Sequence, residues 1–65
     1  MEAVLMRGIE KMKIYKGEQA FTGKTYYRCE VSKPDGSINS LFEWRRFKSL
    51  ERILEFAHEC GFEEM

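Results

Sequence analysis

The segment from Ser49 to Phe62 constrains the fold of this chain more than any other part of the sequence. Its apolar side chains recur at the i, i+3, i+4 and i+7 spacing of a single helical stripe: Leu50, Ile53, Leu54 and Ala57. Ser49 is a favourable N-terminal cap, Gly61 suits a left-handed C-terminal stop, and Phe62 then folds back on the last turn. We predict a helix over residues 50–60. Because its apolar stripe must be buried against a second layer, the preceding residues have to provide that layer.

Residues 25–47 have the pattern of a β-hairpin. Residues 25–32 alternate between two faces, with Tyr27, Cys29 and Val31 on one face and Tyr26, Arg28 and Glu30 on the other. The turn formers Pro34, Asp35 and Gly36 follow. A return strand is predicted over residues 38–47. Its alternation places Ile38, Phe42 and Trp44 on the covered face and Leu41, Glu43 and Arg45 on the opposite face, with a bulge at Ser40.

The first fifteen residues fit two patterns. Met12, Ile14 and Tyr15 suit a strand, whereas residues 4–12 also contain a ragged helical stripe. Gly8 would cost a helix about 1 kcal/mol relative to Ala, and in a strand it favours a bulge. We predict a strand over residues 4–16, followed by a loop over 17–24 whose Phe21 packs under the edge of the sheet.

These segments predict one α+β domain over residues 1–65, with a three-stranded antiparallel meander and a C-terminal amphipathic helix on one face. A chain of this length buries only about 60% of the surface that its unfolded form exposes, so its stability is thin. The predicted core consists of Met12, Ile14, Tyr27, Cys29, Val31, Phe42, Trp44, Leu50, Ile53, Leu54 and Ala57.

The two cysteines, Cys29 and Cys60, lie thirty-one positions apart, and no secretory or membrane-spanning pattern accompanies them. This favours a cytoplasmic protein with reduced thiols over one with a Cys29–Cys60 disulfide. His58 falls on the exposed side of the helix, and it forms no metal-ligand spacing with the cysteines. Because no carboxylates are paired in an apolar context either, we expect neither an enzyme nor a cofactor or metal site.

Equal numbers of basic and acidic residues, eleven each, conceal an uneven distribution. Residues 1–48 carry ten basic and six acidic side chains, a net charge of +4, and residues 49–65 carry one basic and five acidic side chains, a net charge of −4. Cations and aromatic rings interleave on the sheet face that the helix leaves open, which is typical of surfaces that contact nucleic acid. The predicted contacts are Lys11, Lys13, Tyr26, Arg28 and Arg45, with Tyr15 beside them. An ordinary solvated sheet face is the alternative.

A second interpretation is a homodimeric protein-interaction or accessory domain that binds no nucleic acid. The N-terminal segment has more apolar surface than one face of the sheet can bury, at Val4, Leu5, Met6 and Ile9. An acidic stripe follows the helix at Glu51, Glu55, Glu59 and Glu63 and is typical of a solvated face, although it also suits a basic partner.

Two resemblances accompany these patterns. The predicted order of three strands and a helix resembles the arm-binding N-terminal domains of phage-type integrases, which implies DNA contact through the sheet. The stretch Arg45-Arg46-Phe47-Lys48-Ser49-Leu50 resembles the end of the third strand in phox-homology domains, which bind phosphoinositides. Those domains continue with further helices and a proline-rich loop. Because Pro34 is the one proline in this sequence, we expect no complete lipid pocket.

Overall fold

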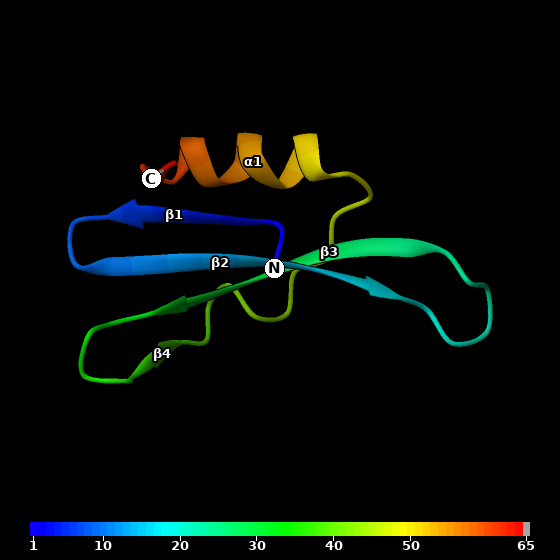
Figure 1. Ribbon diagram of the computed structural model, residues 1–65, viewed down its shortest axis with the longest axis horizontal. Helices are drawn as coiled ribbons and strands as arrows, with labels where there is room; N and C mark the ends of the chain where they lie inside the picture. The colour runs from blue at the N-terminus through cyan, green and yellow to red at the C-terminus, as the bar shows by residue number, and fades with distance from the viewer. Residues whose placement is uncertain (65) are drawn as a thin grey trace.

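The computed structural model describes residues 1–64, which form a five-stranded antiparallel sheet and one helix (Figure 1). The strands follow the order β4-β3-β2-β1-β5 across the sheet. The elements are β1 (Ala3–Arg7), β2 (Glu10–Glu18), β3 (Thr25–Ser32), β4 (Ile38–Asn39), α1 (Leu50–Glu59) and β5 (Glu63–Glu64). The predicted antiparallel sheet with one helix is confirmed, but the prediction of three strands is wrong.

The first strand of the prediction is in fact a hairpin. Arg7 pairs with Glu10, and Gly8 and Ile9 form a two-residue turn between β1 and β2. Gly8 has φ of 58°, which is the positive value that a type II′ hairpin turn requires at its first central position. The prediction of one strand over residues 4–16 is therefore wrong, because Gly8 reverses the chain instead of forming a bulge.

The longest pairing in the sheet joins β2 to β3 over eight residue pairs, from Lys11–Ser32 to Glu18–Thr25. In Figure 1 this hairpin extends well beyond α1. Phe21 lies in its terminal loop and is fully exposed, since no other segment reaches the loop. The prediction that Phe21 packs under the edge of the sheet is wrong.

The predicted return strand over residues 38–47 is also mostly wrong. Only Ile38 and Asn39 pair with β3, after the predicted turn at residues 34–36. The Asn39 side chain then accepts a hydrogen bond from the backbone N–H of Leu41 at 3.1 Å, which favours a turn over a continued strand. The chain returns to the sheet at Phe47, whose N–H and C=O both bond to Tyr27. Trp44, predicted in the core, lies in the segment between and is 70% exposed.

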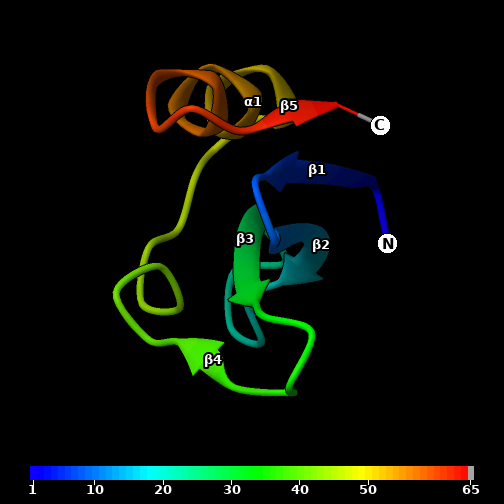
Figure 2. The same ribbon diagram turned by 90° about the vertical axis from the view of Figure 1, so that its left-hand side faces the viewer.

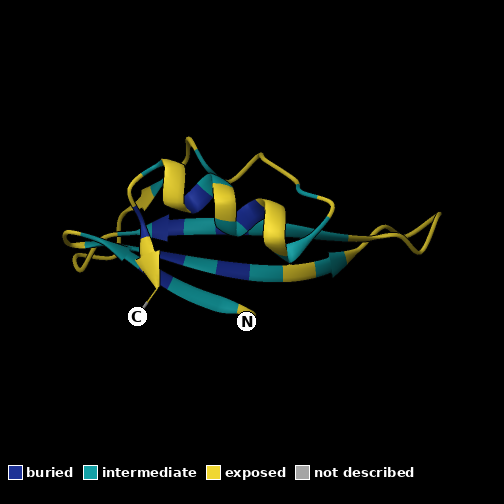
Figure 3. Cartoon of the chain, turned by 90° about the horizontal axis from the view of Figure 1, so that it is seen from above, coloured by how far each residue is buried: buried dark blue, intermediate teal, exposed yellow. Residues whose placement is uncertain are grey.

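The core lies between the sheet and α1 (Figure 3), and most of its members were predicted. Its fully buried residues are Leu5, Met12, Ile14, Cys29, Val31, Ile53, Ala57 and Phe62. Four residues predicted in the core are only partly buried against it: Tyr27, Phe42, Leu50 and Leu54. Phe42 makes edge-to-face contacts with Phe56 and Phe62, at ring-centre distances of 5.9 and 6.0 Å. The segment 40–47 therefore contributes a ring to the core even though it is not a strand.

Both ends of α1 have the predicted caps. The Ser49 hydroxyl accepts a hydrogen bond from the backbone N–H of Arg52 at 3.2 Å. At the other end Gly61 has φ of 90°, and the N–H of Phe62 bonds to the C=O of Ala57 at 2.9 Å, as in a Schellman motif. Arg7 strengthens this corner, because its guanidinium donates to the C=O of Cys60 at 2.8 Å and lies 4.6 Å from the centre of the Phe62 ring.

We predict that Phe62→Ala lowers the free energy of unfolding by about 3–5 kcal/mol, because it removes a fully buried ring. A domain of this size has a total free energy of unfolding of about 3–10 kcal/mol, so the variant loses about a third of it or more and its urea midpoint falls. Urea denaturation followed by circular dichroism measures the effect. Phe21→Ala is the matched control and leaves the midpoint unchanged, because that ring touches solvent only. Equal midpoints for the two variants would place Phe62 outside the core.

Candidate nucleic-acid interface

The sheet has one covered face and one outer face. In Figure 2 the helix and the segment 40–49 lie on the same side of the sheet. We define the outer face by the residues of β1, β2 and β3 that alternate with the buried ones: Val4, Met6, Lys11, Lys13, Tyr15, Gly17, Tyr26, Arg28, Glu30 and Ser32. Four of the five predicted contacts, Lys11, Lys13, Tyr26 and Arg28, therefore lie on one face, as the alternation indicated.

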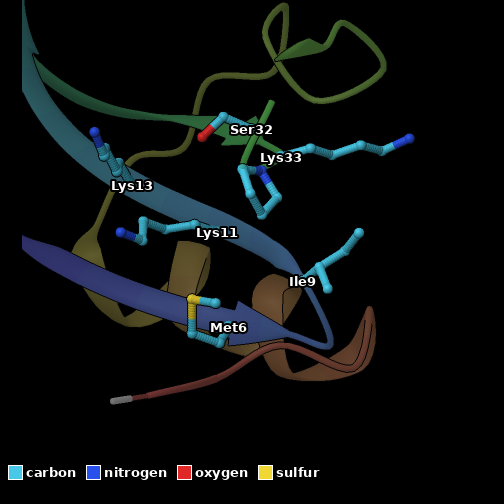
Figure 4. Close-up of a pocket in the computed structure, with 7 residues that line it drawn as sticks. Met6, Ile9, Lys11, Lys13, Ser32 and Lys33 are labelled. Atoms are coloured by element: carbon cyan, nitrogen blue, oxygen red, sulfur yellow. The ribbon is translucent and has the colours of Figure 1, made fainter. Parts of the chain in front are cut away.

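Lys11 and Lys13 line a hollow at one end of the outer face, which we call the lysine hollow (Figure 4). Its volume is about 370 Å³. The described residues that line it are Met6, Ile9, Lys11, Lys13, Ser32, Lys33 and Pro34, and none of these is acidic. In Figure 4 the side chains of Lys11 and Lys13 extend to the same side, whereas the side chain of Lys33 extends the opposite way. The hollow thus combines cations with an apolar floor, and it suits an anionic group that carries an apolar or aromatic part.

A pair formed by one aromatic ring and one cation lies next along the outer face. Tyr15 and Arg28 are partners across β2 and β3, and the Arg28 guanidinium lies 4.7 Å from the centre of the Tyr15 ring. Such stacking fixes the cation in place while its N–H groups remain available to an anion.

Tyr26 lies across the backbone of Gly17 on the outer face. A Cβ atom at Gly17 would come within 2.6 Å of Cζ of Tyr26, so the ring occupies the space that a side chain would need. The Arg46 guanidinium lies 5.3 Å from the centre of the same ring. The glycine therefore lets one aromatic ring lie against the sheet, with the Arg46 guanidinium over it.

Arg45, the fifth predicted contact, is on the other side of the molecule. Its guanidinium lies 4.5 Å from the ring centre of Phe56 on α1 and 5.4 Å from that of Phe47. The strand ends at the turn that Asn39 forms, so the residues that follow no longer alternate between the two faces of the sheet as they would in a continuous strand. The placement of Arg45 on the outer face is wrong, and so is the assumption that residues 40–46 form part of the sheet.

The same early end of the strand places two cations that the sequence analysis missed, Arg46 and Lys48, near a third, Lys24 of the β2–β3 loop. The Phe47 ring faces inward and packs on Phe56 at 5.1 Å between centres. Lys24, Arg46 and Lys48 line a second hollow of about 570 Å³ at the other end of the β2–β3 hairpin, beside Tyr26. The alternation Arg46-Phe47-Lys48 was the available signal, because an inward Phe47 implies outward neighbours.

The acidic side chains lie mainly away from the outer face. Glu51, Glu55 and Glu59 are exposed on α1, on the covered side of the sheet. Two glutamates are exceptions: Glu30 pairs across the strands with Lys13, and Glu63 of β5 pairs with the outer-face residue Met6. Within residues 1–64 the close acid–base contacts are Arg7–Glu10 at 2.8 Å and His58–Glu64 at 3.6 Å. The Arg7 guanidinium lowers the pKa of the Glu10 carboxyl below its ordinary value. Neither contact uses a cation of the outer face, so those cations are available to a ligand.

Residues with reactive side chains are not gathered into a site. Within residues 1–64 no three of the His, Cys, Asp and Glu side chains are close enough to hold a metal ion together. Both cysteines are free, and burial raises the pKa of the Cys29 thiol, which makes it a poorer nucleophile. In the same part of the chain no helix has the length and apolar character needed to cross a membrane. That the protein is not an enzyme remains a prediction.

Comparison of the chain with protein-family models, curated proteins and solved structures gave no match.

We predict that Gly17→Ala displaces the Tyr26 ring from the sheet, because the new Cβ cannot share its space. Tyr26 is only partly buried and swings outward, so the stability loss stays near 1 kcal/mol or below. The chemical shifts of the Tyr26 ring protons in NMR spectra measure the displacement. The control is Gly23→Ala, whose Cβ meets nothing within 4 Å; its φ of 67° adds a backbone strain that Gly17 does not have, so the comparison concerns the Tyr26 shifts and not stability. Unchanged Tyr26 shifts in the Gly17 variant would show that the ring does not lie over residue 17.

Proposed function

We propose that this protein binds single-stranded nucleic acid through the outer face of its sheet, in the cytoplasm where thiols remain reduced. The observation that carries the proposal is the lysine hollow, in which Lys11 and Lys13 extend to the same side without an acidic neighbour in the lining. Alternate residues of one strand lie about 7 Å apart, so the two ammonium groups follow a backbone of repeated phosphates better than one isolated anion.

The aromatic rings favour a single strand over a duplex. Tyr26 lies against the sheet over Gly17, and Tyr15 lies next to it along β2 and β3. Each ring has an arginine guanidinium within about 5 Å of its centre, and both rings and guanidinium planes stack on bases. In a duplex the bases are already stacked and paired, whereas in a single strand they are free to stack on the protein.

The distribution of charge over the molecule also favours binding of the nucleic acid to the outer face. The chain as a whole is neutral, so it has no long-range attraction for a polyanion. The glutamates of α1 and the cations of the outer face lie on opposite sides of the sheet. A polyanion is therefore attracted by one face and repelled by the other, which places the strand on the outer face.

We predict that the protein binds oligo(dT) with an affinity that falls steeply with salt. Phosphate contacts from the three cations of the outer face, Lys11, Lys13 and Arg28, give a log–log slope of about −2.1, which is a loss on the order of 20-fold between about 50 and 200 mM salt. In Lys11→Gln/Lys13→Gln the slope becomes shallower by about 1.4, because two contacts are lost. Fluorescence anisotropy with a labelled oligonucleotide at several salt concentrations measures both quantities.

The control for this titration is Lys16→Gln/Arg52→Gln, which has the same net charge as the test variant. Lys16 has the opposite phase on β2, and Arg52 is exposed on α1, so neither is on the outer face. The control keeps the slope of the unmodified protein. Equal slopes for the two variants would mean that overall charge, and not the outer face, determines binding.

The second candidate function is self-association through the outer face. Met6, Ile9 and Pro34 supply the apolar part of the lysine hollow, and Ile9 is 67% exposed. Ile38 on the neighbouring edge strand is 48% exposed, which extends this apolar surface. Of the four apolar residues that suggested a dimer from the sequence, Leu5 is fully buried, so it contributes nothing to an interface.

Sedimentation velocity distinguishes the two candidates. If the outer face binds nucleic acid, we expect a monomer at high micromolar concentration, because the lysines of two copies would repel each other. An apolar interface instead gives a dimer that strengthens as salt screens this repulsion. A dimer that Ile9→Lys abolishes would support self-association and would contradict the nucleic-acid proposal as stated.

A further inference from the structure

The second hollow is separate from the lysine hollow, lies at the edge of β3 and reaches the outer face at Tyr26. Both contain residues of β3 that point outward, Ser32 in the first and Tyr26 in the second. Six residues at about 3.3 Å each separate these positions, so the two hollows lie about 20 Å apart. Arg28 lies between them on the same face of the same strand.

The lining of the second hollow suits phosphate. It contains Lys24, Arg46 and Lys48, together with the Tyr26 ring, and none of the described residues that line it is acidic: Gln19, Lys24, Thr25, Tyr26, Arg46, Phe47 and Lys48. Two segments far apart in the sequence supply the cations, residue 24 from the β2–β3 loop and residues 46 and 48 from the return to the sheet. They are held together by the paired N–H and C=O groups of Phe47 and Tyr27, at 2.8 and 2.9 Å.

Arg46 is fixed in this position by the turn that contains it. One of its guanidinium nitrogens donates to the C=O of Glu43 at 2.8 Å and to that of Arg45 at 3.1 Å. These bonds direct the guanidinium toward the Tyr26 ring without neutralising its charge. Lys24 and Lys48 are exposed and contribute charge without such a structural role.

We propose that the second hollow is a phosphate subsite for the same nucleic-acid strand that occupies the lysine hollow. This inference rests on the proposed function and adds a minimum ligand length. A single strand whose phosphates follow the spacing of about 7 Å between alternate residues needs about four nucleotides to span about 20 Å and reach both hollows. Linked subsites then raise the affinity of any strand that spans them, because the second contact forms at high effective concentration.

The test compares oligo(dT) of three and twelve nucleotides by anisotropy at about 0.1 M salt, with the full chain. Lys24→Gln/Lys48→Gln removes charge from the second hollow and leaves the hydrogen bonds of Arg46 intact. We expect it to lower the affinity for the dodecamer on the order of tenfold. The trinucleotide reaches one hollow at a time, so its affinity falls at most about twofold. Lys16→Gln/Arg52→Gln is again the charge-matched control.

The possible failures are distinguishable. If Lys11→Gln/Lys13→Gln weakens dodecamer binding but Lys24→Gln/Lys48→Gln does not, the subsite is refuted and the proposed function stands. If neither the trimer nor the dodecamer binds below about millimolar, both are refuted. Binding to vesicles of anionic phospholipid in the absence of dodecamer binding would assign the basic face to a membrane surface and overturn both proposals.

Discussion

The pairing of β2 with β3 is the constraint on which the rest of this structure depends. Eight residue pairs fix the register, and this register separates the side chains into those that contact α1 and those that do not. Met12, Ile14, Cys29 and Val31 are fully buried as a consequence. A slip of one residue would exchange the two faces, placing lysines in the core and apolar residues in solvent. The same register thus determines both the stability of the domain and the composition of its outer face.

A small domain with one helix can cover only one face of its sheet. In this protein the segment 40–47 covers part of the same face as α1, since Phe42 and Phe47 both pack on Phe56. The outer face therefore keeps its cations and rings partly accessible to solvent without a cost to the core. Since the acidic residues of α1 lie on the covered side, the sheet separates charges that would otherwise neutralise each other. This separation is a property of the fold, because the net charge of the chain is zero.

The features that the sequence predicted correctly depend on local chemistry. The caps at Ser49 and Gly61, the turn at Pro34–Gly36 and the alternation of β3 each involve residues that are close along the chain. The alternation along β2 and β3 correctly placed four of the predicted contact residues on the outer face. The errors arose where one residue changes the direction of the chain: Gly8 creates an additional strand, and Asn39 ends a strand early. Neither has a pattern distinctive enough to separate a reversal from a bulge, so Arg45 and Trp44 were assigned the wrong surroundings, and Arg46 and Lys48 were overlooked.

The segment 40–46 also controls the access of solvent to the buried Cys29 thiol. The Sγ atom of Cys29 lies 3.7 Å from the C=O of Phe42, so this segment covers the thiol. The backbone bonds of the segment are local, such as that from the N–H of Phe42 to the C=O of Asn39 at the end of β4, and those of residues 40–46 do not reach β1, β2 or β3. It can therefore open at a lower free energy than global unfolding requires. Each opening exposes Cys29 to oxidants and alkylating reagents while the β2–β3 ladder stays intact. The reaction rate of the Cys29 thiol thus measures how often the segment 40–46 opens locally.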